Sequence, residues 1–348
     1  MNGLWEQLLT DSTDHRTRRL AWRTMRQFAD PGQLAEEFEF EPRWLWSVAQ
    51  QTATQPGDAV KLLLASPPDI HVETSPPTRR EVRCETVVLF PPGPSPMHKS
   101  RRLSRATACI SSQPGCGVGC PFCSTASLGY RGNLSSSQII EQVYWAGMVA
   151  RQRGRRLRNV VFMGMGEPLH NTSAVLEALA WLTAPHGFGL SPRHITVSTA
   201  GVPAAMVALA ERFPRVRLAL SLHSADAQQR RELVPRAHGD LAVLQRTIAQ
   251  VNALQAQPLW IEVVLFDQRN DTLDHAQQLV TFCGQLRVEV NLIPYNAAGN
   301  VQRFVASPRE RREAFAQVLR EAGIRTTIRT SLGDAAQAAC GQLTAEWD

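Results

Sequence analysis

The sequence is nearly without lysine: Lys61 and Lys99 are the only lysines among 37 basic residues, so the net charge of +6 comes almost wholly from arginine. It also lacks any run of about 18 apolar residues, which excludes a membrane-spanning helix. The first residues show no basic stretch followed by an apolar one, so we expect no signal peptide. A composition of 43% hydrophobic and 20% charged residues is typical of a globular protein rather than a disordered one.

The chain also lacks an even number of cysteines, since it has seven. An odd number does not make a closed disulfide framework. We therefore expect a reducing, cytoplasmic location in which the thiols stay free. The planar guanidinium of arginine suits phosphate groups and base edges, so the positive charge favours a nucleic-acid partner, although a genome rich in G and C would also favour arginine over lysine.

The chain divides into three predicted regions. Residues 1–75 have a polar, helical pattern and predict a small helical accessory domain. Residues 76–108 follow as a strand-loop linker, which includes a strand-like run at 82–90 and a basic loop. Residues 109–348 form the main domain and its C-terminal segment.

From about residue 106 onward, strand-like runs alternate with helical patterns. Parallel strands need long crossover connections, so six such units predict an α/β fold, a partial (β/α)6 barrel. In barrels of this type the functional residues gather at the C-terminal ends of the strands. The expected strands are 106–111, 159–163, 194–199, 217–222, 260–266 and 288–293, and the expected helices are about 135–152, 172–184, 202–212, 240–254, 274–285 and 308–322.

Three cysteines, Cys116, Cys120 and Cys123, follow a C-x3-C-x2-C spacing with no fourth Cys or His close by. A structural zinc site normally has four protein ligands. A 4Fe-4S cluster is held by thiolates, and with only three of them it keeps one iron open for a small molecule. The spacing therefore favours a radical S-adenosylmethionine (SAM) cluster. A zinc knuckle with a distant fourth ligand, or a buried group of thiols, is the alternative.

Candidate ligand-binding residues follow the ends of later strands. Gly166 lets the backbone approach a ligand closely, and Glu167 offers a carboxylate to an ammonium group such as the methionyl amine of SAM. A tight turn with a solvated Glu is the alternative for this pair, and His223 on its own is more often structural than catalytic. The polar side chains at the ends of the later strands are Ser198, Ser221, His223 and Asn296.

Two further cysteines stand at unusual places for core residues. Cys109 ends the first barrel strand, shortly before the three-cysteine loop. Cys340 lies just before the C-terminus, where chains are usually mobile. Each of them alone could equally be a small buried hydrophobic residue, and Cys84 and Cys283 are interpreted in that way.

Together these motifs resemble the RlmN/Cfr family, radical SAM RNA methyltransferases that methylate a carbon of adenine. The resemblance covers about 81–345 in consistent order. Residues 1–75 do not align convincingly with the N-terminal domain of the family, which contacts RNA, and Pro114 and Tyr295 differ from the commonest members. The stretches that carry the resemblance are 109–126, Gly164-Met165-Gly166-Glu167-Pro168-Leu169, Ser221-Leu222-His223 and Ala339-Cys340-Gly341-Gln342-Leu343.

The resemblance implies a reaction that uses two SAM molecules per turnover. Cys340 would take a methyl group and become S-methylcysteine. A second SAM on the cluster held by Cys116, Cys120 and Cys123 would be cleaved to a radical that activates this methyl group. Glu85 would be the proton acceptor, and Cys109 would release the product through a transient disulfide with Cys340. The SAM contacts implied are Gly166, Glu167, Ser198, Ser221, Leu222, His223 and Asn296.

We therefore expect methylation of adenine, at C2, in ribosomal RNA, transfer RNA or both. The alternatives are methylation at C8 in 23S ribosomal RNA, a non-catalytic iron-sulfur or zinc protein that binds RNA, and a glycyl-radical activase, which would not need Cys109 and Cys340. The expected partners are the RNA and an electron donor such as flavodoxin, and the expected form is a monomer in the cytoplasm with no membrane contact.

Overall fold

The computed structural model describes residues 26–28, 44–54, 57–67, 81–92, 104–185, 187–297, 304–329, 333 and 337–344. The ten strands in these residues form one continuous sheet, and their spatial order repeats their order along the chain. Neighbouring strands are antiparallel from β1 to β4 and parallel from β4 to β10. The strands are β1 (Ser47–Ala53), β2 (Ala59–Ala65), β3 (Arg83–Leu89), β4 (Arg105–Ile110), β5 (Arg156–Phe162), β6 (Ile195–Thr199), β7 (Arg217–Ser221), β8 (Leu259–Leu265), β9 (Val288–Pro294) and β10 (Thr326–Ile328).

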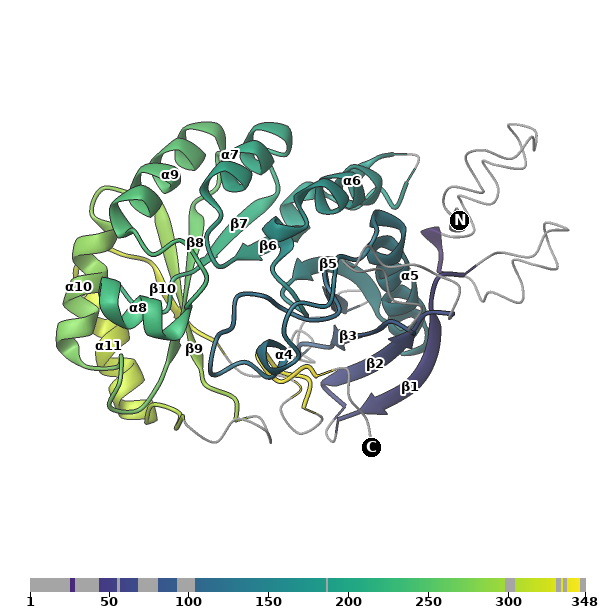
Figure 1. Ribbon diagram of the computed structural model, residues 1–348, viewed down its shortest axis with the longest axis horizontal. Coiled ribbons are helices and arrows are strands. Elements are labelled where there is room, and N and C mark those ends of the chain that lie inside the picture. Colours follow the sequence, from purple (N-terminus) through teal and green to yellow (C-terminus); the bar gives the residue numbers. More distant parts are fainter. Residues whose placement is uncertain are drawn as a thin grey trace, which may run out of the picture.

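Helices connect the parallel strands on the outer side of the curved sheet, with the strands at the centre of the molecule (Figure 1). This arrangement confirms the partial (β/α)6 barrel, and the six expected strands and helices are present. The short elements α4, α8 and β10 were not predicted from the sequence. The helices are α4 (Ser124–Ser127), α5 (Ser136–Gln152), α6 (Thr172–Thr183), α7 (Pro203–Arg212), α8 (Ala227–Leu233), α9 (Leu241–Leu254), α10 (Leu273–Cys283) and α11 (Arg309–Glu321), with 3-10 turns η1 (Pro168–His170) and η2 (Pro192–His194).

The barrel strands are buried on both faces, which is why their sequences read as short apolar runs. Every residue of β6 is buried, as expected where helices cover one face of a parallel sheet and side chains fill the other. Four helices, α5, α8, α9 and α10, begin at a side-chain cap. At the start of α5, Ser135 and Gln138 form a reciprocal capping box, which satisfies backbone donors that a helix end leaves free.

The segment before the barrel differs from the expectation of a helical domain over 1–75. Residues Ser47–Ala53 and Ala59–Ala65 are the antiparallel strands β1 and β2, and β2 pairs along its length with β3. The run Ala59–Ala65 is buried throughout, and periodicity alone does not distinguish such a short apolar run from a buried helix. The helical prediction is therefore wrong for these residues, while most of the remaining residues before 44 lie outside the described ranges.

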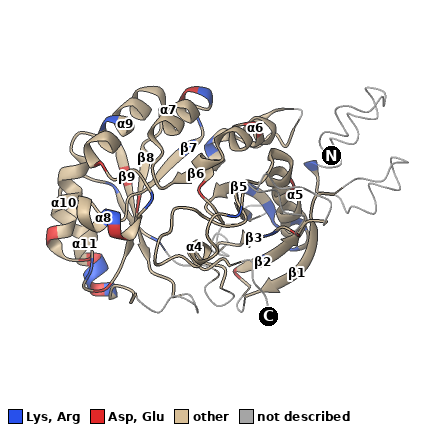
Figure 2. Cartoon of the chain, in the orientation of Figure 1, with Lys and Arg blue, Asp and Glu red and all other residues tan. Residues whose placement is uncertain are grey.

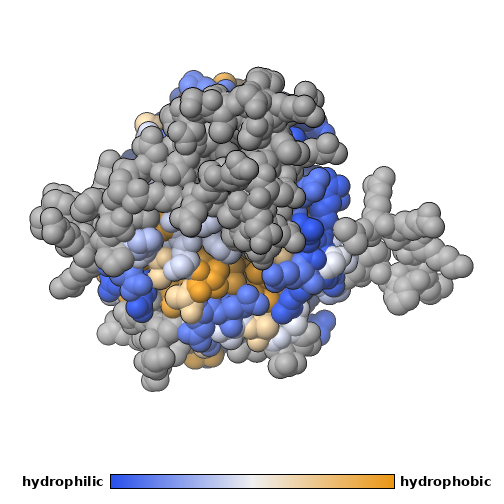
Figure 3. Space-filling view, turned by 90° about the vertical axis from the view of Figure 1, so that its right-hand side faces the viewer, coloured by the Kyte–Doolittle hydropathy of each residue, from blue (hydrophilic) through white to orange (hydrophobic). Residues whose placement is uncertain are grey.

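The linker expected over 76–108 contains strands of the same sheet. β3 lies within it and pairs with β4, with Val87 opposite Cys109. The division into three regions stays a prediction, but its second boundary falls inside β4. On the side where β1 lies, hydrophobic residues gather in a patch between hydrophilic ones (Figure 3), and β1 itself has mostly exposed side chains.

The C-terminal residues return to the strands at the other end of the sheet. Residues 337–344 lie beside α4 and the ends of β2 and β3 (Figure 1, yellow). This return places Cys340 near the three-cysteine loop. Within the described ranges, no helix is both long and apolar enough to cross a membrane.

Candidate active site

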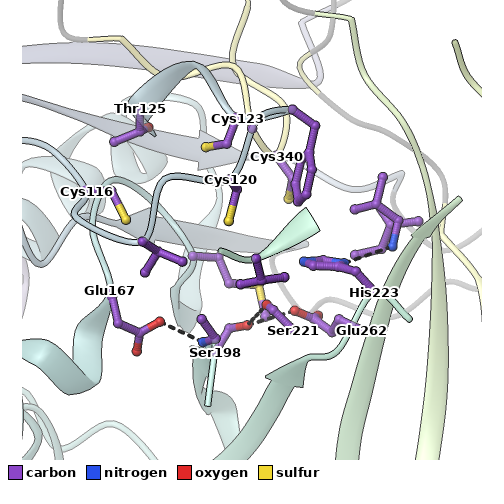
Figure 4. Close-up of a pocket in the computed structure, with 18 of the residues that line it drawn as sticks. Cys116, Cys120, Cys123, Thr125, Glu167, Ser198, Ser221, His223, Glu262 and Cys340 are labelled. Atoms are coloured by element: carbon purple, nitrogen blue, oxygen red, sulfur yellow. Dashed lines mark hydrogen bonds between the residues drawn. The ribbon is translucent and has the colours of Figure 1, made fainter. Parts of the chain in front are cut away.

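One cavity lies at the C-terminal ends of the parallel strands, with a volume of about 1020 Å³ counted out to its open mouth. Most of the residues expected to act on SAM line it (Figure 4). The expected residues that line the cavity are Cys116, Cys120, Cys123, Gly166, Glu167, Ser198, Ser221, His223, Asn296 and Cys340.

The three-cysteine loop forms one side of this cavity, and the sulfur atoms point into it (Figure 4). Burial raises the pKa of Cys116 to about 12, and it raises the pKa values of Cys120 and Cys123 as well. Repulsion from Cys123 adds to the rise for the other two thiols. Three thiols that are held close together and away from water are costly to ionise, and a bound cation would remove this cost.

These residues fit a 4Fe-4S cluster. Backbone N–H groups of Val118 and Thr125 donate toward Cys116 and Cys123 and stabilise their thiolates, which is the usual way a protein supports cluster sulfur. Gly119 has a φ of +79°, a conformation that favours glycine and lets the loop turn sharply. In the part of the chain that the structure describes, no group of three or more Cys, His, Asp or Glu side chains is arranged to hold a single metal ion.

The turn after β5 is fastened to the loop after β4. Ser111 Oγ accepts the N–H of Met165 at 2.8 Å, and Gln113 Oε1 accepts the N–H of Glu167 at 2.9 Å. Gly166 lies between Met165 and Glu167 and has a φ of +94°. A Cβ at this position would approach the Gln113 Cβ to 2.5 Å. A larger residue at 166 would therefore push the turn away from Gln113.

Glu167 is buried but fully hydrogen-bonded. Its Oε1 accepts from Thr199 Oγ1 at 2.6 Å and from the Leu169 N–H at 2.9 Å, and its Oε2 accepts from the Ala200 N–H at 2.7 Å. Burial raises the pKa of Glu167, and these hydrogen bonds oppose the rise. Its orientation is therefore set before any ligand binds, as suits a carboxylate that receives an ammonium group.

A chain of polar side chains crosses the floor of the cavity. Ser198 Oγ lies 3.2 Å from Ser221 Oγ and donates to Glu262 Oε2 at 2.8 Å. Glu262 in turn pairs with Arg329, whose Nη1 lies 3.3 Å from Oε1. The sequence reasoning found the two serines but missed Glu262 and Arg329. Glu262 sits inside an expected strand, whereas Arg329 follows the short strand β10, which had no recognisable signal.

His223 serves the cavity as a neutral donor. Its Nδ1 accepts the Val264 N–H at 3.2 Å, so the remaining ring proton is on Nε2. Burial, together with the nearby charge of Arg230, lowers the pKa of His223 to about 3. The ring packs edge-on against Phe122 of the cysteine loop, with the ring centroids 5.1 Å apart. The residue is held in a strained backbone conformation, with a φ of +60°, which is uncommon for a residue with a side chain.

Arg230 in α8 is a third residue of the site that the sequence did not predict. Its guanidinium is fully buried and donates to three backbone carbonyls, those of Ser221, Leu222 and Ala200, at 2.9, 2.6 and 2.5 Å. The pKa of Arg230 is lowered to about 10, because the effect of burial outweighs the attraction of a Cys120 thiolate. Arg230 therefore ties the ends of β6 and β7 together behind the cysteine loop.

Leu222 and Glu85 do not line the cavity. Leu222 is fully buried, and its backbone N–H donates to the Glu262 carbonyl at 3.0 Å. Glu85 in β3 is also buried, and its Oε1 lies 2.9 Å from Lys61 Nζ. The roles expected for both residues stay predictions.

Cys109 and Cys340 are close enough to influence each other. Burial raises the pKa of Cys109, a Cys340 thiolate raises it further, and Arg329 lowers it. Burial likewise raises the pKa of Cys340, and Arg329 again lowers it. Both thiols are free and Cys340 is exposed to the cavity. Arg329 therefore assists ionisation of both thiols.

Replacing Arg329 should slow disulfide formation between these two thiols. We expect Arg329→Gln to form the Cys109–Cys340 disulfide roughly three- to tenfold more slowly with a mild oxidant, because fewer thiolates are present at neutral pH. The rate is measured by trapping free thiols and peptide mass spectrometry. Arg325→Gln is the matched control, since Arg325 is 80% exposed and pairs with Glu289. An equal rate in both variants would contradict the role of Arg329.

Comparison with known proteins agrees with this site. A sequence model of the radical SAM superfamily matches residues 110–283. A radical SAM methyltransferase from Sphaerobacter thermophilus has a similar structure, with a TM-score of 0.80, 31% identity and coverage of 99% of this chain and 98% of that one. The partial barrel and the three-cysteine cavity thus define a radical SAM protein.

Proteins of similar sequence narrow the class of radical SAM protein to which the chain belongs. A probable RNA methyltransferase of Rhodopirellula baltica is 47% identical over 69% of this chain and 63% of its own length. The dual-specificity RNA methyltransferase RlmN of Syntrophobacter fumaroxidans is 43% identical over 70% of this chain and 71% of its own length. The chain belongs to the RlmN/Cfr family of radical SAM RNA methyltransferases.

The similarity does not extend over the full length of these relatives. The chain matches 63% of the Rhodopirellula baltica protein and 60% of a probable RlmN of Frankia alni, which is less than two thirds of each.

Proposed function

We propose that the protein methylates C2 of an adenine in ribosomal RNA, transfer RNA or both, through S-methylcysteine at Cys340 and a transient disulfide with Cys109. The observation that carries this proposal is the shared cavity: Cys340 and the loop of Cys116, Cys120 and Cys123 open into the same space (Figure 4). A cluster bound by the loop, together with SAM, supplies a carbon radical that removes a hydrogen atom. The remaining chemistry belongs to residues of the chain.

Cys340 is the acceptor of the first methyl group. Its thiolate attacks the methyl carbon of SAM, so a new sulfur-carbon bond forms as the bond to the sulfonium breaks. The exposure of Cys340 to the cavity allows this approach, and Arg329 lowers the pKa of its thiol.

The cavity also contains groups suited to hold SAM. Glu167 is oriented to receive the amine, and neutral His223 offers its Nε2 proton as a donor. Ser198, Ser221 and Asn296 supply further hydroxyl and amide groups. We assign two SAM molecules per turnover to this one site.

Cys109 completes the cycle. After the methylene carbon of Cys340 has joined the adenine carbon, Glu85 takes the ring proton and the adduct radical loses one electron, for which a bound cluster would be the acceptor. The Cys109 thiolate then attacks the Cys340 sulfur. A sulfur-sulfur bond forms as the sulfur-carbon bond breaks, and the electron pair of the broken bond stays with the methylene carbon, which takes a proton and becomes the methyl group. The disulfide then needs two electrons from a reductant, for which we propose an electron donor such as flavodoxin.

Basic residues at the N-terminal ends of β4 and β5, opposite the cavity end of these strands, offer a contact for RNA phosphates away from the active site. Arg105 and Arg156 face each other on neighbouring strands, where like charges repel, and Arg158 lies nearby. None of the three pairs with a carboxylate in the described ranges, and the basic residues around β5 stand out in Figure 2. Phosphate groups would relieve this repulsion.

The proposal is tested by mass spectrometry of the protein and of its RNA product. After incubation with SAM and a reduced cluster, the peptide that contains Cys340 should gain the mass of one methyl group, and Cys340→Ala should show no gain. Nucleoside analysis of treated RNA should then detect 2-methyladenosine. Detection of 8-methyladenosine instead would replace C2 by C8, and absence of both products would refute the proposed reaction.

A further inference from the structure

A buried ion pair joins β2 to β3 beside the C-terminal segment. Lys61 Nζ lies 2.9 Å from Glu85 Oε1, and the two side chains are 7% and 0% exposed. Removing two charges from water is costly, and their attraction compensates only if further hydrogen bonds satisfy the remaining donors and acceptors. Each member of this pair therefore needs a second partner.

Both second partners belong to the segment that carries Cys340. Lys61 Nζ donates to the carbonyl of Gln337 at 3.2 Å, and the N–H of Thr344 donates to Glu85 Oε2 at 2.8 Å. The ion pair thus contacts both ends of residues 337–344, and Cys340 lies midway between these contacts. We call this arrangement of Lys61, Glu85 and the two ends of the segment the C-terminal clamp.

Among the described residues, neutral groups hold the middle of the segment, and the Gln342 amide donates to the Ala297 carbonyl at 2.8 Å. The Ser124 N–H donates to the Gly341 carbonyl at 2.8 Å, and Thr125 Oγ1 donates to the Leu343 carbonyl at 2.7 Å. Hydrogen bonds to ionised groups are roughly twice as strong as those between neutral groups. The charged contacts at the two ends are therefore expected to dominate the docking of the segment.

We propose that Lys61 is a positioning residue for Cys340, and that the C-terminal clamp sets where the Cys340 thiol stands in the cavity. The role of the clamp in catalysis rests on the proposed function, to which it adds how Cys340 is positioned. Glu85 is the expected proton acceptor, yet its two oxygens are engaged by Lys61 and Thr344. Opening of the clamp at Thr344 frees Oε2, so movement of the Cys340 segment and availability of the carboxylate are coupled.

Hydrogen exchange of the reconstituted full-length protein tests the clamp. Lys61→Met with Glu85→Gln removes both charges together, so neither is left buried and unpaired. We expect the amides of 337–344 to exchange at least about tenfold faster, which corresponds to about 1.4 kcal/mol, while those of α9 keep their wild-type rate. The single variant Lys61→Arg keeps the positive charge opposite Glu85, so its residues 337–344 should exchange as slowly as in the wild type.

The matched control is the exposed pair of Arg83 and Glu81 at the start of the same strand; Arg83→Gln should leave exchange of 337–344 unchanged. Two outcomes overturn the proposal: exchange within about twofold of wild type in the double variant, or an equal acceleration throughout the protein, which is a purely structural effect. The measurement needs neither SAM turnover nor RNA. Local acceleration in the double variant, together with a wild-type protein that does not methylate RNA, would therefore refute the proposed function and leave the clamp standing.

Discussion

Cys109→Ala should accumulate RNA covalently attached to Cys340. Methyl transfer to Cys340 needs only its own thiolate and SAM, so this step should continue, and the methylene group should still join the adenine. Without the Cys109 thiol, nothing attacks the Cys340 sulfur, and the thioether to RNA persists. We expect most of the active enzyme to be trapped after one turnover, visible as slowly migrating labelled RNA on a denaturing gel.

A purely structural role of Cys109 predicts a different result. Cys109 is 8% exposed and packs in the core, so loss of its sulfur would cost roughly 1 kcal/mol of stability and lower all steps together. Cys283→Ala is the control for such a packing loss, because Cys283 is a buried cysteine of α10 far from this chemistry. Normal turnover of Cys109→Ala without an adduct would remove this residue from the mechanism.

The second large effect is expected at the cysteine loop. Replacing Cys116, Cys120 and Cys123 together with Ala should reduce bound iron from about four atoms per chain, the number that the cluster type sets, to nearly none. The brown absorbance and reductive SAM cleavage should disappear with it, because Cys340 is the one remaining thiol among the described residues that line the cavity.

Single replacements in the loop should already abolish SAM cleavage, since loss of one thiolate leaves the cluster with too few ligands. The Cys283→Ala variant should bind iron as the wild type does. If the triple variant retained close to four iron atoms, the cluster would be bound elsewhere, and the assignment of the loop would be wrong.

Much of the barrel could be predicted because its signals are local. Each strand from β4 to β9 is a short apolar run, and each long connection contains an amphipathic helix, so the alternation is visible in any window of the sequence. The antiparallel strands β1 and β2 were missed because the run Ala59–Ala65 becomes a strand only by pairing with β3. A local window does not contain that partner.

The residues of the site divide in the same way. Cys116, Cys120 and Cys123 could be found from their spacing, and Glu167 from its place after a strand. Glu262, Arg329 and Arg230 could not, since a charged residue in a strand, after a strand or in a short helix has no distinctive pattern. Their importance depends on contacts with residues far away in the sequence.

The sequence by itself determined the class of fold, the cluster loop and the resemblance to one family, because these depend on periodicity and on the spacing of nearby residues. Only the tertiary structure decided that Arg329 stands beside both Cys109 and Cys340. It also decided that Glu85 is paired with Lys61 and bound to the segment of Cys340. Charge interactions and hydrogen bonds act over a few ångströms in space, so they are settled only when the chain brings distant residues together.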